Sequence, residues 1–65
     1  MSMCMITLYK GNMEDENKIA DNITKYSLDL DAKKIKVYPM LKEPQEFTIE
    51  KGLTWDESND SMIIE

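Results

Sequence analysis

The chain has 65 residues, 13 of them acidic and 8 basic, which gives a formal net charge of -5. This length predicts one small β domain over residues 1–65, near the lower limit at which a hydrophobic core folds alone. One cysteine and no histidine exclude an intrachain disulfide, a tetrahedral zinc site within one chain and Cys-His catalysis. We therefore expect a protein that is not an enzyme.

Membrane and nucleic-acid partners are also not expected from the composition. No apolar run approaches the ~20 residues of a membrane span, and the first residues lack the features of a signal peptide. The acidic balance, with lysine as the only basic residue type, argues against a broadly phosphate-binding surface. A single unpaired cysteine suits a reducing compartment, so we expect a cytoplasmic protein.

The first strand is expected over residues 3–9, where side chains alternate with the period of a half-buried strand. Cys4, Ile6 and Leu8 share one face of this segment. Turn chemistry follows at Gly11, and an acidic connector leads to the next apolar positions.

Further short segments alternate in the same way and are separated by turn signals. Strands, or in the first case a strand or a bend, are expected at 19–23, 26–30, 35–38, 45–50, 53–55 and 61–65. Pro39 and Pro44 bracket a loop, because proline removes a donor from the strand ladder. Six or seven such strands predict an all-β fold, a small antiparallel β-barrel whose closure removes exposed edges.

The inward positions of these strands predict the core. The expected core residues are Ile6, Leu8, Ile19, Ile23, Leu28, Leu30, Ile35, Val37, Phe47, Ile49, Leu53 and Trp55, with Met62 and Ile64, or Ile63, in the last strand. Phe47 and Trp55 are expected to fill its centre, because large aromatic side chains dominate small cores. So small a core leaves a thin margin of stability, and association into a homodimer is expected to add to it.

Soft-metal chemistry in this chain must use Cys4, which stands between Met3 and Met5. Thiolate and thioether ligands select soft or borderline metals, and a backbone nitrogen beside the sulfur closes a five-membered chelate. Two such nitrogen-sulfur pairs give the four-coordinate plane that Ni(II) favours. One chain supplies half of the set, and a two-fold dimer duplicates any ligand near its axis. Cys4 and Met3 are therefore the candidate metal ligands.

Two other interpretations stay open at this point. A strand cysteine is usually a small, buried hydrophobic residue, so the chain also fits a protein-interaction module in which Cys4 is structural. Lys33, Lys34 and Lys36 form a local basic cluster, and Tyr38 offers an aromatic ring on the same strand face. That combination fits a small barrel that binds nucleic acid, with an affinity that falls steeply with salt.

The run Met3-Cys4-Met5 at the head of an alternating strand resembles the start of the CooT family of small nickel-binding proteins. Residues 18–23 and the closing hairpin at 53–65 also look similar to family segments, so the resemblance covers most of the chain. It implies a small β-barrel homodimer, joined through the N-terminal strand region, that binds Ni(II) through Cys4 of each chain. It also implies a client nickel enzyme such as carbon monoxide dehydrogenase.

The family pattern differs from this chain at one point. In the family the cysteine directly follows the initiator methionine, whereas Met1 and Ser2 precede Met3 and Cys4 here. A native chain that starts at Met3 would return Cys4 to the family position. With Met1 and Ser2 present, Cys4 has no free amine, and only amide nitrogen is available beside its sulfur.

Overall fold

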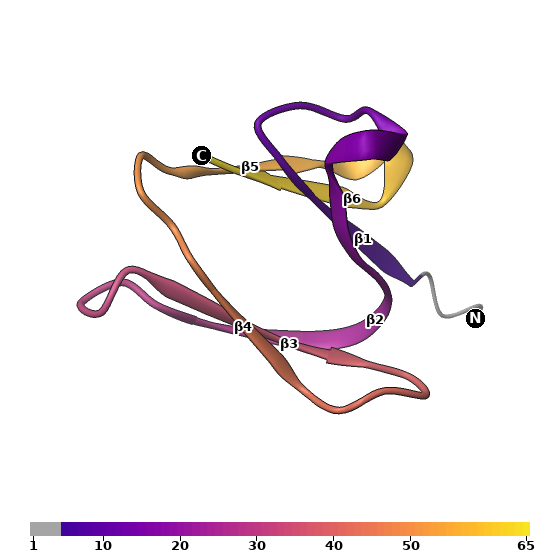
Figure 1. The fold of residues 1–65 in the computed structure, drawn as a ribbon, viewed down its shortest axis with the longest axis horizontal. Helices are drawn as coiled ribbons and strands as arrows, with labels where there is room; N and C mark the ends of the chain where they lie inside the picture. Colours follow the sequence, from indigo (N-terminus) through magenta and orange to yellow (C-terminus); the bar gives the residue numbers. More distant parts are fainter. Residues whose placement is uncertain (1–4) are drawn as a thin grey trace.

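The structure is a computed structural model, and it describes residues 5–65. The elements are β1 (Ile6–Lys10), η1 (Asp15–Asn17), β2 (Lys18–Asp29), β3 (Lys34–Pro39), β4 (Gln45–Thr48), β5 (Leu53–Asp56), η2 (Glu57–Asn59) and β6 (Ser61–Ile64). Both η elements are single turns of 3-10 helix. The prediction of a small all-β fold is confirmed, and six strands are present in the described residues (Figure 1).

All six strands belong to one sheet, in the order β4-β3-β2-β1-β6-β5. Four neighbouring pairs are antiparallel, but β1 and β6 are parallel, which corrects the expectation of a wholly antiparallel sheet. The direction of β6 is set by its hairpin with β5, and the parallel register places Met62 beside Leu8, where both side chains are buried. The strand order leaves β4 and β5 at its two ends, so the described sheet folds over without closing as a barrel.

One long strand, β2, connects the two halves of the folded sheet (Figure 1). Its residues 18–23 pair with β1, and its residues 23–29 pair with β3. A register shift between Ile23 and Lys25 and a left-handed φ of 52° at Asn22 mark the bend. Because a bulge of this kind increases the local twist, one strand serves both halves where the sequence predicts two separate segments.

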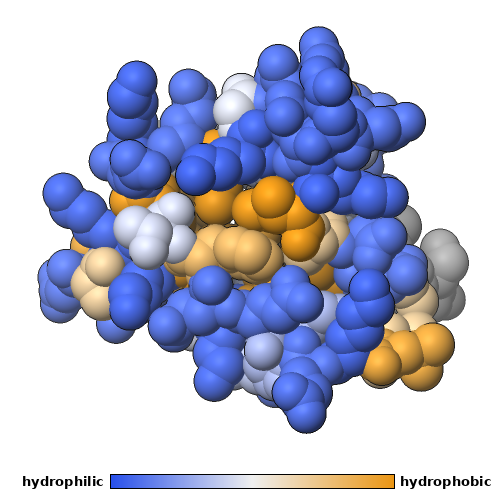
Figure 2. Space-filling model, in the orientation of Figure 1, coloured by the Kyte–Doolittle hydropathy of each residue, from blue (hydrophilic) through white to orange (hydrophobic). Residues whose placement is uncertain are grey.

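The core lies between the two halves. Its buried residues are Leu8, Ile23, Ile35, Val37, Ile49, Met62 and Ile64, all of them at expected core positions. Figure 2 shows the apolar side chains as a band across the middle of the molecule, with hydrophilic side chains above and below it. Full burial of one such side chain stabilises the fold by about 1.5–3 kcal/mol, so each of these residues contributes noticeably to the stability of so small a domain.

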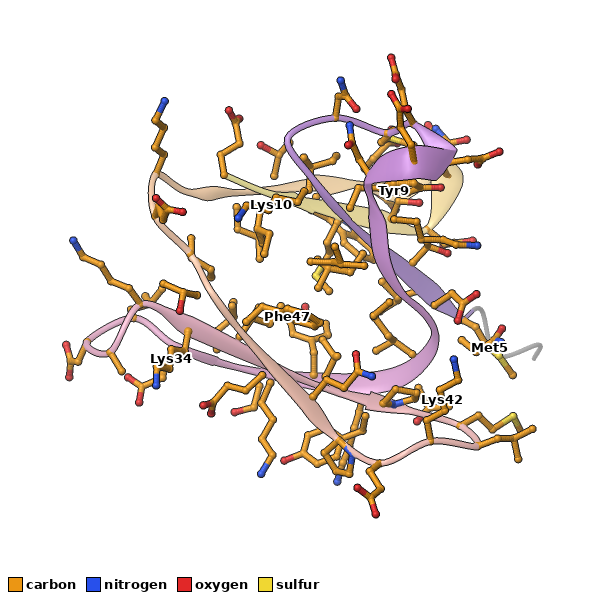
Figure 3. The ribbon with its side chains drawn as sticks, in the orientation of Figure 1. Met5, Tyr9, Lys10, Lys34, Lys42 and Phe47 are labelled. Carbon is orange, nitrogen blue, oxygen red and sulfur yellow. The ribbon has the colours of Figure 1, made fainter. Side chains whose placement is uncertain are left out.

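Three expected core residues lie at the margin or outside the core. Leu30 is 78% exposed because it follows β2 at the start of the turn, where no strand covers it. Trp55 is 44% exposed on β5, which has a neighbour on one edge only, so the prediction that it fills the centre of the core is wrong. Leu28 is 42% exposed on the second half of β2. Phe47, by contrast, is half-buried and packs against the core (Figure 3).

Candidate functional site

The candidate metal ligands Cys4 and Met3 lie outside the described residues. The first described residue after them is Met5, which is half-buried directly before β1. Cys4 is joined to Met5 by a peptide bond. The surroundings of Met5 and of the start of β1 are therefore the part of this site that the structure describes.

The start of β1 lies close to the loop between β3 and β4. Ile6 pairs with Ile23 on one edge of β2, and Ile23 pairs with Pro39 on the other edge. Neighbouring strands are about 4.8 Å apart, so the start of the loop is about 10 Å from the start of β1. Figure 3 accordingly shows Met5 and Lys42 at the same end of the molecule.

This loop is held at its base and begins with two exposed apolar residues. The Met40 backbone N–H donates a hydrogen bond of 2.9 Å to the Asn22 carbonyl oxygen. Beyond that bond, Met40 is 57% exposed and Leu41 is 92% exposed. The thioether sulfur of Met40, a weak soft ligand, is thus presented at the end of the molecule where β1 starts.

Residues 5–65 contain no clustered metal-ligating side chains and no pocket. No cluster of three or more His, Cys, Asp or Glu side chains is present among them. No pocket is found in this part of the chain either. The candidate ligands Cys4 and Met3 precede these residues, so the metal site stays a prediction.

The predicted basic cluster is reorganised around one aromatic ring. The Lys36 Nζ lies 5.6 Å from the centre of the Tyr38 ring, as their shared strand face predicts. The Lys25 Nζ lies closer, at 4.6 Å, because Lys25 pairs with Tyr38 across the two strands. Sequence reasoning missed Lys25, since its position depends on the register shift in β2. Both distances suit a cation-π contact.

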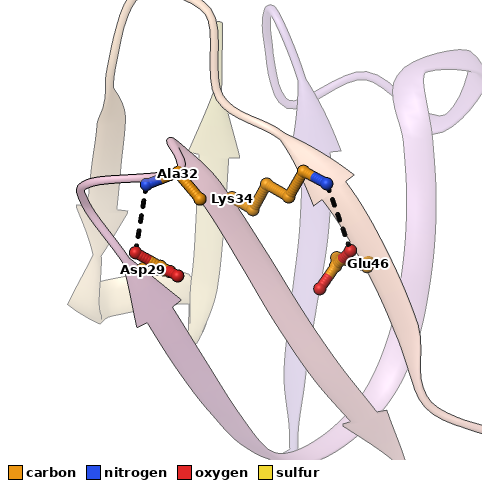
Figure 4. Close-up of polar contacts among 4 residues, drawn as sticks. All are labelled: Asp29, Ala32, Lys34 and Glu46. Atoms are coloured by element: carbon orange, nitrogen blue, oxygen red, sulfur yellow. Dashed lines mark hydrogen bonds and ion pairs between the residues drawn. The ribbon is translucent and has the colours of Figure 1, made fainter.

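The rest of the predicted basic cluster is partly neutralised or remote. The Lys34 Nζ lies 3.6 Å from the Glu46 carboxylate on the neighbouring strand β4 (Figure 4). Lys33 lies in the turn between β2 and β3 with a φ of 55°. The structure thus places one lysine of the predicted cluster, Lys36, at Tyr38 together with Lys25, which lies outside that cluster. A second lysine of the cluster, Lys34, is paired with a carboxylate.

No protein-family model, curated protein or solved structure matches this chain. Among residues 5–65, no helix has the length and apolar character needed to cross a membrane. The proposed function therefore rests on the chain's own residues, their surroundings and the resemblance of Met3-Cys4-Met5 to the CooT family.

Proposed function

We propose that this protein is a nickel-binding accessory protein, a metallochaperone without enzymatic activity. Two subunits hold Ni(II) through their Cys4 thiolates and adjacent backbone nitrogen, with Met3 beside them. The metal is then delivered to a nickel enzyme such as a carbon monoxide dehydrogenase. The observation that carries this proposal is the run Met3-Cys4-Met5, which holds the chain's single cysteine directly before the central strand β1.

Three features of the chain support the proposal. Two of the four methionines among residues 5–65 lie at one end, where Met5 precedes β1 and the exposed Met40 lies on the neighbouring loop. A net charge of -5 favours the approach of a cation. A site with one sulfur per chain also suits delivery, because a ligand set shared by two chains is opened by separating them.

The proposal is tested by titrating Ni(II) into the reduced wild-type chain and into Cys4→Ser. We expect a thiolate-to-nickel charge-transfer band in the wild type that saturates at one nickel per two chains. The Cys4→Ser variant should show no such band. Met13→Leu is the matched control, since it removes an exposed thioether that follows β1 rather than precedes it, and it should keep the band. Equal nickel binding by the wild type and Cys4→Ser would contradict the proposal.

The nitrogen donor is tested by comparing the full chain with one that begins at Met3. If the terminal amine of Cys4 becomes a ligand after removal of the first methionine, the shorter chain should bind nickel more tightly at a given pH. Its affinity should also fall as the pH drops and the amine is protonated. Equal affinity in both chains would assign the nitrogen to the backbone amide.

A second candidate function is binding of nucleic acid by the outer face of β2 and β3. The observation that favours it is the pair of ammonium groups of Lys25 and Lys36 within 5.6 Å of the Tyr38 ring. Such binding should weaken steeply with salt, because phosphate contacts release counterions. An affinity that does not change with salt, or that survives Lys36→Ala, would exclude this face.

A further inference from the structure

The second half of β2 has a strand on one edge only. Its residues 25–29 pair with β3, whereas the pairing of β1 with β2 ends at Ile23. No strand within residues 5–65 lies along the other edge of residues 25–29. A row of unpaired backbone N–H and C=O groups is a template for adding a further strand.

The side chains of this edge are apolar on one face. Tyr26 lies opposite Val37 and Leu28 lies opposite Ile35, so both point to the same face as two fully buried residues. They are nevertheless 43% and 42% exposed. No strand of residues 5–65 covers Tyr26 and Leu28 along this edge, and an added strand would cover both side chains.

The other face of this edge carries two opposite charges, those of Lys25 and Asp29. Asp29 accepts a hydrogen bond of 3.0 Å from the Ala32 backbone N–H through Oδ1, while its cross-strand neighbour Lys34 turns to Glu46 (Figure 4). Lys25 lies over the Tyr38 ring. Neither Lys25 nor Asp29 takes part in an ion pair within residues 5–65.

We propose that the second half of β2 pairs with the same segment of a second copy of this chain, antiparallel, about a two-fold axis at Ser27. In this register Lys25 lies opposite Asp29 of the partner subunit, and Tyr26 lies opposite Leu28 of the partner subunit. The two-fold axis repeats each pair, which gives two contacts between opposite charges and two apolar contacts.

Cross-strand pairs of these kinds stabilise an antiparallel sheet, and like charges placed opposite each other destabilise it. The edge of β5 is the nearest rival, since a two-fold axis at Thr54 would place Leu53 opposite Trp55. That pairing offers apolar contact without a pair of opposite charges. The second half of β2 offers both, and its five residues are few enough that the dimer should dissociate on dilution.

This association does not rest on the proposed nickel function, because it uses β2 and needs neither Cys4 nor a metal. It has one rival occupant within the chain. A strand continued backwards from Ile6 would run towards Lys25, so residues 1–4 could cover the same edge. The experiment below distinguishes the two occupants.

The test is sedimentation equilibrium of the metal-free chain over a range of concentrations. We expect the wild type to dimerise reversibly. Lys25→Asp alone and Asp29→Lys alone should remain monomeric, because each places like charges opposite each other at both contacts. An equimolar mixture of these two variants should form heterodimers, since every contact then joins opposite charges. The double variant should dimerise again.

Two control variants complete the experiment. Trp55→Ala, on the rival edge, and Cys4→Ser should both dimerise as the wild type does. Circular dichroism should show that the two charge variants keep the β fold. A wild type that stays monomeric, charge variants that still dimerise, or a mixture that stays monomeric would each overturn the proposal. A dimer that forms only after residues 1–4 are deleted would also overturn it, in favour of those residues.

Discussion

The two halves of β2 differ in burial although both carry apolar side chains. Ile23 lies at the bend with Ile6 on one edge and Pro39 on the other, and its side chain is fully buried. Tyr26 and Leu28 follow in the same strand with a neighbour on one edge, and each keeps more than 40% of its surface exposed. At these positions of β2, burial therefore follows the number of neighbouring described strands, which is two at Ile23 and one at Tyr26 and Leu28.

The largest expected effect lies at the bend, where Ile23→Ala should destabilise the fold by about 2–5 kcal/mol. Removing a fully buried branched side chain loses its transfer energy and leaves a cavity. Urea denaturation followed by circular dichroism measures the loss. Leu28→Ala is the matched control in the other half, and it should cost less than half as much. Equal losses at the two positions would contradict the comparison.

A smaller effect is expected from the backbone of the bend. Asn22 has a φ of 52°, which asparagine tolerates and alanine does not. Asn22→Ala should therefore cost about 1–2 kcal/mol in the same measurement. Asn22→Gly removes the same side chain but accepts this φ, so it should cost less than the alanine variant. A glycine variant that is less stable than the alanine variant would assign the role of Asn22 to its side chain.

The smallest effect is expected just beyond the second half of β2. Leu30 is 78% exposed, so Leu30→Ser should change the free energy of unfolding by no more than about 0.5 kcal/mol. The same denaturation experiment measures it. A loss comparable to that of Leu28→Ala would mean that the turn is covered in solution, and the comparison would then have to include it.

The sequence predicted correctly the features that depend on residues close together in the chain. In β3 the alternation of lysines with Ile35 and Val37 gave the correct buried face, because the β2–β3 hairpin brings its strands together through a short turn. The turn at Gly11 was predicted from its residue type, and its φ of 88° fits that role.

Features that depend on distant strands could not be predicted in the same way. Large aromatic residues such as Trp55 are typical of the centre of a core. Trp55 nevertheless lies on an edge strand, because β5 is at one end of the strand order in the described sheet. The contact of Lys25 with Tyr38 depends on one extra residue at the bend of β2. For the candidate metal site, residue chemistry and the resemblance to the CooT family predicted Cys4, and this remains a prediction because Cys4 precedes the described residues.

The parallel pairing of β1 with β6 also has a consequence for folding. These two strands are the first and the last of the described chain, yet they are neighbours near the middle of the sheet. During synthesis β1 leaves the ribosome before the other described strands, but its parallel partner β6 leaves after all of them. Because contacts between distant segments slow folding, we expect the pairing of β1 with β6 to be among the last to form. Until then, the central strand itself has an open edge.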